Sequence, residues 1–177
     1  DDQFYGGVLA TIFNDEEYEL HRCLNCGHYQ YLYNLDENKL KTMYYEHEKF
    51  RLSKTEGTNQ SHEDRVRKVA QGLVSKLKKM SPLNPTLLDY GSGTGLWASI
   101  AREAGFDTIA YEPHNIRIPK GVPTETNWEN IKLKKFDVII CNQVLEHIVT
   151  PNLTISELKS VSKDGTLLYC SVPNAGK

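Results

Sequence analysis

The 177-residue sequence lacks the features that mark several special classes of protein. It has only four cysteines, with one close pair, so it is not a disulfide scaffold. Its longest apolar runs, such as 136–141, are no longer than a strand, so we expect no membrane span. The N-terminus has neither the basic region nor the apolar stretch of a signal peptide. These absences predict a soluble, cytoplasmic protein.

A strong charge of either sign is also missing. The formal net charge is −2, and 25% of the residues are charged. A chain with this balance has no basic field to attract nucleic acid or an anionic membrane. Its length is enough for one domain with a real core and a small appendage. The sequence starts without methionine and stops just after a strand-like run, so we expect a fragment of a longer chain.

The residue pattern divides the chain into three segments. Residues 1–35 are rich in aromatic side chains and contain a Cys-x-x-Cys pair, and the alternation at 29–33 predicts a short strand after it. Residues 36–85 predict a helical lid or linker, with helices at 36–50 and 62–80 around a polar loop at 53–61. Asp36 is the candidate N-cap of the first helix.

Residues 86–177 alternate between strand and helix patterns. Strands are predicted at 87–90, 108–112, around Val122, 136–142 and 166–172, with helices at 96–104 and 153–161. Repeated strand–helix–strand units predict an α/β fold, a doubly wound and mostly parallel sheet with helices on both faces.

The first of these strands ends in three closely spaced glycines, Gly91, Gly93 and Gly95. Ligands of open α/β sheets bind at the carboxyl ends of the strands. Glycines allow a ligand to approach the backbone closely and permit positive φ. A glycine-rich connection without a ligand is the alternative.

Two acidic residues distinguish among the possible ligands. A dinucleotide turn has the spacing Gly-x-Gly-x-x-Gly, whereas the third glycine here comes one residue earlier. Asp89, two residues before the first glycine, suits an ammonium group better than a pyrophosphate. Glu112 ends the second strand, where an acid can accept hydrogen bonds from ribose hydroxyls. The pattern favours a nucleoside that carries positive charge.

The stretch Leu87-Leu88-Asp89-Tyr90-Gly91-Ser92-Gly93-Thr94-Gly95 resembles the first motif of class I S-adenosylmethionine-dependent methyltransferases. Three further stretches resemble later motifs of that family in the same order: Tyr111-Glu112-Pro113, residues 136–148 and residues 163–168. The resemblance covers about residues 86 to 174, or half of the chain.

The resemblance implies a role for each matching position. The three glycines would pass under the methionine part of the cofactor, Asp89 would contact its amino group, and Glu112 would hold the ribose hydroxyls. Asn127 and Trp128 would flank the adenine, although the family often has an acid where Asn127 stands. Asn142 would face the methionine or methyl end.

His147 is the candidate catalytic base, because it follows the fourth strand and its usual pKa near 6.5 suits a proton acceptor. The alternative is a helix-start residue that packs beneath the site. Glu146 is expected to orient or support its neighbour. Cys141 and Cys170 lie inside strands and are expected to be core residues.

The pair Cys23-x-x-Cys26, followed by Gly27, resembles a zinc knuckle. A structural zinc site needs four ligands, so a partner pair would have to lie upstream, or His21 and His28 would serve, or the pair is a relic. Redox use is disfavoured, because no thioredoxin-like strand-to-helix pattern surrounds the pair.

The order of these segments is similar to methyltransferases with an N-terminal zinc-binding segment, among them sugar C-methyltransferases. That resemblance implies five substrate-side candidates ahead of the core: Tyr44, Tyr45, Asn59, Gln60 and His62. A solvated loop and core-facing tyrosines are the alternative. The family core continues with a helix and two more strands, which the 177 residues do not include.

The sequence therefore predicts an S-adenosylmethionine-dependent methyltransferase that acts on a small molecule, with a nucleotide-linked sugar among the candidates. The alternatives are a methyltransferase-like binding or scaffold domain without turnover and a nicotinamide-dependent oxidoreductase. Neither the acceptor nor the oligomeric state follows from the sequence.

Overall fold

The computed structural model describes residues 19–31, 36, 38–43, 45, 60–114 and 121–173. The chain divides into two compact units, and residues 60–174 form the larger one. Within the described residues, no helix is both long and apolar enough to cross a bilayer.

The larger unit alternates between strands and helices, as the sequence predicts. In chain order its elements are α3 (Gln60–Met80), β3 (Thr86–Tyr90), α4 (Leu96–Glu103), β4 (Asp107–Tyr111), β5 (Thr124–Glu125), α5 (Trp128–Ile131), β6 (Phe136–Asn142), the 3₁₀ helix η1 (Leu145–His147), α6 (Pro151–Ser160) and β7 (Ser162–Ser171).

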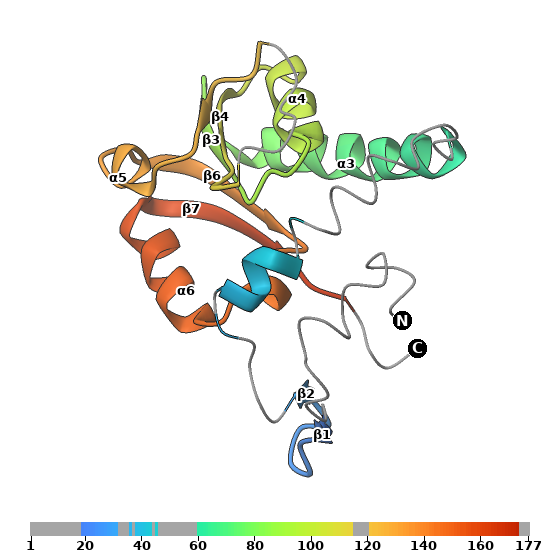
Figure 1. Ribbon diagram of the computed structural model, residues 1–177. Helices are drawn as coiled ribbons and strands as arrows, with labels where there is room; N and C mark the ends of the chain where they lie inside the picture. The colour runs from blue at the N-terminus through green and yellow to red at the C-terminus, as the bar shows by residue number, and fades with distance from the viewer. Residues whose placement is uncertain are drawn as a thin grey trace. The chain divides into compact units, whose positions relative to one another are not determined.

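The five strands form one sheet in the order β5-β4-β3-β6-β7 (Figure 1). Every neighbouring pair is parallel, which confirms the predicted doubly wound α/β fold. The chain runs outward from β3 through β4 to β5, and then returns to place β6 on the other side of β3. The strand order therefore reverses between β3 and β6, and such a reversal leaves a crevice at the carboxyl ends of the two strands.

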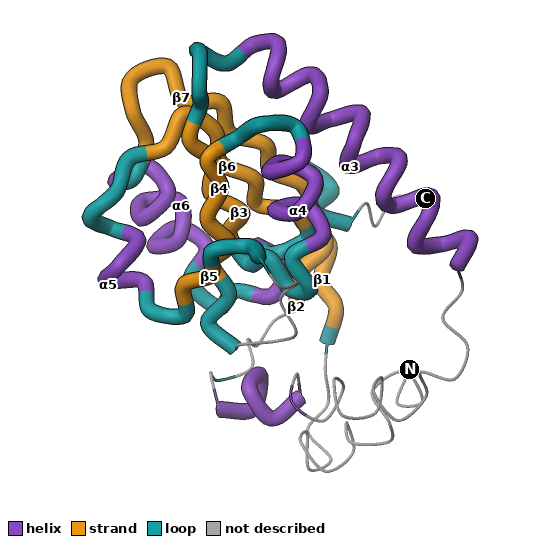
Figure 2. The backbone as a smooth tube through the Cα atoms, turned by 90° about the horizontal axis from the view of Figure 1, so that it is seen from above, coloured by secondary structure: helices purple, strands orange, loops and turns teal. Residues whose placement is uncertain are grey.

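Helices lie on both faces of the sheet (Figure 2), and one hydrophobic cluster packs between helices and sheet on each face. On one face α3 and α4 pack through residues such as Val74, Trp97 and Ile100. On the other face α5 and α6 pack through Ile131 and Leu158. Alternate residues of β3 and β6 point to opposite faces, so these two strands are buried on both sides, as is usual for the centre of a parallel sheet.

A partly exposed polar contact joins the amino-terminal ends of three strands. Oδ2 of Asp137 accepts hydrogen bonds from the backbone N–H and the hydroxyl of Thr86, each at 2.9 Å, and from Lys163 at 2.8 Å. Burial raises the pKa of Asp137, but these donors outweigh it and hold the pKa below its usual value. The contact fixes β3, β6 and β7 at one end, so the loops at the other end start from defined positions.

Some element boundaries differ from the sequence prediction. The third strand is at Thr124–Glu125 and not around Val122, and β4 ends at Tyr111, so Glu112 follows the strand. The last strand begins at Ser162 and includes the predicted turn at 163–165, because the register with β6 shifts between Phe136 and Val138. Helix α3 begins at Gln60, inside the predicted loop.

The smaller unit contains a short antiparallel pair, β1 (Leu20–Arg22) and β2 (Tyr29–Tyr31). The second of these strands was predicted, and the first was not. Residues 38–43 are helical, and Oδ1 of Asp36 accepts the N–H groups of Asn38 and Lys39 at 2.9 Å. The predicted role of Asp36 as an N-cap is confirmed.

Candidate cofactor site

The candidate site lies at the carboxyl ends of β3, β4 and β6, where the strand order reverses. The turn after β3 comprises residues 91–95, and we call it the glycine turn. Gly91, Gly93 and Gly95 all have positive φ, at 68°, 53° and 71°. L-amino acids with side chains rarely adopt this conformation, so the three glycines are required by the backbone itself.

Hydrogen bonds attach the glycine turn to β4. The N–H groups of Gly91 and Ser92 both donate to the carbonyl oxygen of Tyr111, at 2.9 and 3.0 Å. The N–H of Gly95 closes the turn on the carbonyl oxygen of Ser92 at 2.8 Å. The backbone of the turn is therefore held in one place before any ligand arrives.

The glycine turn also contacts the loop after β6. A Cβ atom at Gly91 would lie 2.6 Å from Cγ2 and 2.9 Å from Cγ1 of Val144, which is closer than real Cβ contacts. Nothing lies within 4 Å of the corresponding position at Gly93. Val144 was not singled out from the sequence, because only the pairing of β3 with β6 brings it over Gly91.

Asp89 lies at the end of β3 and is only 2% exposed. Its Oδ2 accepts the backbone N–H of Ala98, in the first turn of α4, at 2.9 Å. Burial raises the pKa of Asp89 to about 7; the Ala98 hydrogen bond opposes this shift, and the nearby Glu112 carboxylate adds to it. The side chain is thus a carboxyl group on which negative charge is unfavourable, and a cation placed beside it would favour ionisation.

Glu112 follows β4, is 6% exposed and connects two loops. Its Oε2 accepts the N–H of Gly93 at 2.9 Å, and its Oε1 accepts the N–H of His114 at 3.1 Å. A carboxylate oxygen has room for more than one donor, so both oxygens can still accept further hydrogen bonds. Glu112 therefore positions the glycine turn and also presents acceptors at the carboxyl end of β4.

The hydroxyl of Ser92 is an exception among the described side chains, because it is buried and has no hydrogen-bond partner. Ser92 is 8% exposed and lies between two of the turn glycines. Buried polar atoms normally have a partner, so an unpaired hydroxyl in this turn is consistent with a ligand group that would complete it. The sequence motif contains Ser92, but nothing in the pattern signals that its hydroxyl is unpaired.

Asn127 and Trp128 begin α5, after β5. Oδ1 of Asn127 accepts the N–H of Glu129 at 3.0 Å, so the amide caps the helix. Trp128 contacts two tyrosine rings edge-on, Tyr90 at 5.7 Å and Tyr111 at 5.4 Å between centroids. These rings hold Trp128 against the ends of β3 and β4, and the predicted adenine contacts of both residues stay predictions.

Asn142 ends β6, and its amide is held by β7. Ser171 donates its hydroxyl to Oδ1 of Asn142 at 2.7 Å, and the N–H of Gln143 donates to the carbonyl oxygen of Ser171 at 2.9 Å. Gln143 has a φ of 56°, which is rare outside glycine. The chain thus turns sharply after β6 toward Val144, and the predicted role of Asn142 at the methyl end stays a prediction.

His147 lies in η1, three residues after Val144, and its side chain is 47% exposed. Nε2 lies 3.9 Å from Oε1 of Glu146. Partial burial lowers the pKa of His147 below its usual value of 6.5, and Glu146 opposes the shift. The imidazole is therefore mostly neutral at pH 7, which is the state that a general base requires.

Cys23 and Cys26 lie in the turn between β1 and β2. Gly27, with a φ of 73°, donates its N–H to the carbonyl oxygen of Cys23 at 2.9 Å. Hydrogen bonds from the backbone N–H groups of Cys26 and Asn25 lower the pKa of the Cys23 thiol. Among the described residues, no group of three or more metal-binding side chains is present, so this part of the chain does not hold a complete zinc site.

The substrate-side candidates have no described position relative to this site. Tyr44 and Asn59 lie outside the described residues. Gln60 and His62 lie in the first turn of α3, where the structure describes only the backbone. Tyr45 is 69% exposed and belongs to the smaller unit, so its role stays a prediction.

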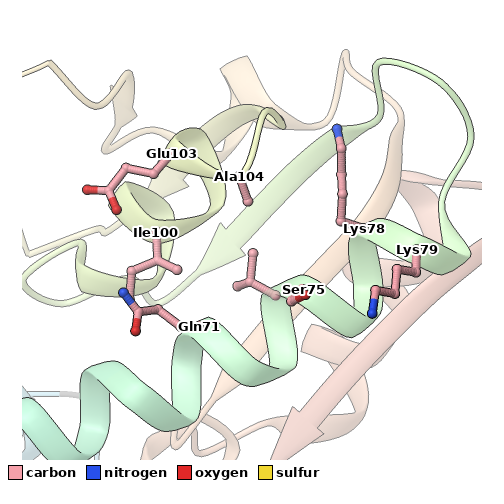
Figure 3. A pocket seen from close by; sticks show the side chains of 8 residues that line it. Gln71, Ser75, Lys78, Lys79, Ile100, Glu103 and Ala104 are labelled. Atoms are coloured by element: carbon pink, nitrogen blue, oxygen red, sulfur yellow. The ribbon is translucent and has the colours of Figure 1, made fainter.

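A groove of about 590 Å³ lies elsewhere, between α3 and α4 (Figure 3). Apolar residues such as Val74 and Ile100 and polar side chains such as Lys79 and Glu103 line it. It includes none of the residues at the carboxyl ends of the strands. This groove therefore does not mark the candidate site, which we place by the chemistry of the glycine turn.

Comparison with known proteins identifies the family. The model of a family described as "Methyltransferase domain" matches residues 62–177, more than half of the chain. The chain belongs to this methyltransferase-domain family. The match begins at residue 62 and includes all of α3 except its first two residues, so the helix packed on the sheet is part of the methyltransferase domain. No curated protein matches the sequence significantly.

Two solved methyltransferase structures illustrate the more distant likenesses. A SAM-dependent methyltransferase from Archaeoglobus fulgidus is 18% identical, with a TM-score of 0.46, over 62% of this chain and 54% of its own. The magnesium protoporphyrin IX methyltransferase from Synechocystis PCC 6803, solved with bound SAM, is 18% identical, with a TM-score of 0.44, over 60% of this chain and 61% of its own. This chain thus spans less than two thirds of either structure. The family assignment rests on the family model.

Proposed function

We propose that this methyltransferase domain binds S-adenosylmethionine and transfers its methyl group to a small molecule. The observation that carries the proposal is the pair of buried carboxyl groups, Asp89 and Glu112, at the glycine turn. A pyrophosphate would be repelled by such a pair, and residues 87–97 contain no lysine or arginine to offset it. A nicotinamide dinucleotide is therefore disfavoured.

The residues at this turn fit the two ends of S-adenosylmethionine. The ammonium group of its methionine part would favour ionised Asp89, whose charge is costly in the free protein. Its ribose hydroxyls would donate to Glu112 oxygens that already hold the glycine turn. The unpaired hydroxyl of Ser92 and the uncrowded backbone at Gly93 also support a ligand against this turn.

When bound, S-adenosylmethionine supplies a methyl group on a positively charged sulfur. Transfer to an acceptor is an in-line displacement, so the main task of the protein is to hold the two reactants in line. The glycine turn follows β3, and the loop from Asn142 to His147 follows the end of the neighbouring strand β6. Val144 in this loop packs against Gly91 in the turn. His147 is suited to take a proton from a hydroxyl or a carbon acid, because it is neutral near pH 7.

A small molecule is the acceptor class that composition supports. The chain has a net charge of −2, so a basic surface of the kind that binds nucleic acid is not expected. A nucleotide-linked sugar is the finer proposal, and it depends on the resemblance of the N-terminal segment. A binding or scaffold domain without turnover is the second candidate, because a cofactor site does not by itself provide an acceptor site.

Calorimetric titration with S-adenosylhomocysteine and with NAD tests the cofactor. We expect binding of the first and not of the second. Glu112→Ala should weaken S-adenosylhomocysteine binding by about 1–3 kcal/mol, because Glu112 would no longer accept hydrogen bonds from the ribose and from the N–H of Gly93. Glu103→Ala, an exposed acid at the end of α4, is the matched control and should bind normally. Binding of NAD alone would overturn the proposal.

The role of His147 has a separate test that uses the release of S-adenosylhomocysteine as the measure of transfer. His147→Ala should retain cofactor binding and lose about 10²–10⁴-fold in transfer rate to an acceptor that must lose a proton. The wild-type rate should rise with pH through a midpoint below 6.5, since partial burial lowers the pKa of His147 below that value. An unchanged rate in the variant would show that His147 is not the base.

Zinc remains a separate proposal for the smaller unit. Backbone hydrogen bonds lower the pKa of Cys23, which makes the thiolate, the form that binds metal, easier to form. The described residues provide two ligands of the four that a structural site needs, so we derive no step of methyl transfer from zinc.

A further inference from the structure

The loop after β6 meets the glycine turn through one side chain, that of Val144. A Cβ atom built on Gly91 would lie 2.6 Å from Cγ2, 2.9 Å from Cγ1 and 3.4 Å from Cβ of Val144. All three side-chain carbons of the valine therefore rest on the bare backbone of the glycine. Val144 can occupy this place only because residue 91 has no side chain.

The residue before Val144 has a strained backbone that leads the chain to this contact. Gln143 has a φ of 56°, and among the described residues that are not glycine only Asn84 also has a positive φ. Asparagine tolerates this conformation better than glutamine does. The N–H of Gln143 donates to the carbonyl oxygen of Ser171 at 2.9 Å, which holds the strained residue against β7. Strain of this kind persists where the surroundings impose it, and it is concentrated at functional sites.

After Val144 the chain enters the turn that carries His147. The N–H of His147 donates to the carbonyl oxygen of Val144 at 2.9 Å and closes η1. Leu145 and Ile148 pack, as Val144 does, against the hydrophobic cluster on the α6 face of the sheet. Val144 thus joins the two parts of the site, with its side chain on Gly91 and its carbonyl oxygen bound to His147.

We propose that Val144 is a positioning residue: its contact with Gly91 sets the place of His147 relative to a cofactor bound at the glycine turn. The side chain fixes the loop to the turn, and the carbonyl oxygen transmits that position to the backbone of His147 through η1. Methyl transfer depends on alignment, and a misplacement of about 1 Å can cost about 10²-fold in rate. The inference rests on the proposed function, in which S-adenosylmethionine occupies the turn and His147 is the base.

An NMR experiment on the ligand-free 177-residue chain tests the link between the turn and His147. The ring signal of His147 in a proton–carbon spectrum is assigned by its loss in His147→Gln. Gly91→Ala should displace this signal, because the new Cβ pushes Val144 away. Gly93→Ala, with a positive φ but no atom within 4 Å of its Cβ position, is the matched control and should leave the signal in place. In a Val144→Ala background, Gly91→Ala should no longer displace it.

A second experiment uses S-adenosylhomocysteine and no substitution in the glycine turn, so it does not depend on the Gly91 variant folding. Saturation with this ligand should displace the His147 signal of the wild type. Val144→Ala should bind the ligand as tightly as the wild type in calorimetry and yet show a smaller displacement. Val144→Ile keeps Cβ, Cγ1 and Cγ2 and should behave as the wild type. A loss of stability alone would not change the response of the folded protein.

Three results would overturn the proposal. The first is an unmoved His147 signal in folded Gly91→Ala. The second is a displacement that persists when Gly91→Ala is made in the Val144→Ala background, because the link would then bypass Val144. The third is an equal response to the ligand in Val144→Ala and in the wild type. A wild type that does not bind the ligand would overturn the proposed function instead, and the ligand-free experiment would still decide whether Val144 joins the turn to His147.

Discussion

Replacing Gly91 with alanine is expected to destabilise the larger unit by about 2–4 kcal/mol. Two effects add at this position. A side chain at a φ of 68° is strained, and the new Cβ would lie 2.6 Å from Cγ2 of Val144. Because Val144 lies on the loop after β6, the strain would pass from the glycine turn to the region of His147. Urea denaturation, followed by circular dichroism, measures the loss.

Gly93→Ala is the matched control for this prediction. It shares the positive φ, at 53°, but no atom lies within 4 Å of its Cβ position. Its cost should be limited to the backbone strain, about 1–2 kcal/mol. Adding Val144→Ala to the Gly91 variant should recover part of its loss by removing the steric clash. Equal costs at the two glycines would contradict the contact between Gly91 and Val144.

Replacing Asp89 with asparagine is expected to remove much of the pH dependence of folding between about pH 4 and pH 7. The pKa of Asp89 rises from 3.8 to about 7 in the folded protein. Across this window the folded state keeps a proton that the unfolded state has released, so stability falls as the pH rises. The difference in pKa corresponds to at most about 4 kcal/mol. Asparagine cannot ionise, but its oxygen can still accept the N–H of Ala98.

Denaturation of the two proteins at pH 4 and at pH 8 measures this effect. Asp89→Asn should be the more stable of the two at pH 8, with the difference shrinking toward pH 4. If instead the wild-type protein gains stability over the same range relative to the variant, Asp89 has an ordinary or lowered pKa. In calorimetry near pH 7, S-adenosylmethionine binding should release protons from the wild type and fewer from Asp89→Asn, because an ammonium group favours the ionised carboxyl.

The sequence predicts the elements of the larger unit because their signals are local. The strand-sized apolar run at 136–142 and the periodic apolar residues of 62–80 correspond to β6 and α3. Boundaries are less well predicted where pairing decides them. The short strand β5 exists through its pairing with β4, and β7 extends over a predicted turn through a shift of register. Neither the pairing of β5 with β4 nor the register shift of β7 can be read from the residues of that strand alone.

The sequence by itself determined the fold class, the glycine turn and the presence of acids at the ends of two strands, since all three depend on residue type and spacing. Only the tertiary structure decided what these residues contact. It placed Val144 over Gly91, joined Glu112 to Gly93 and buried Asp89 beneath α4. It also paired Cys141 with Cys170 across 29 residues of sequence. Such contacts depend on strand order and register, because these bring distant segments together, and no local pattern records them.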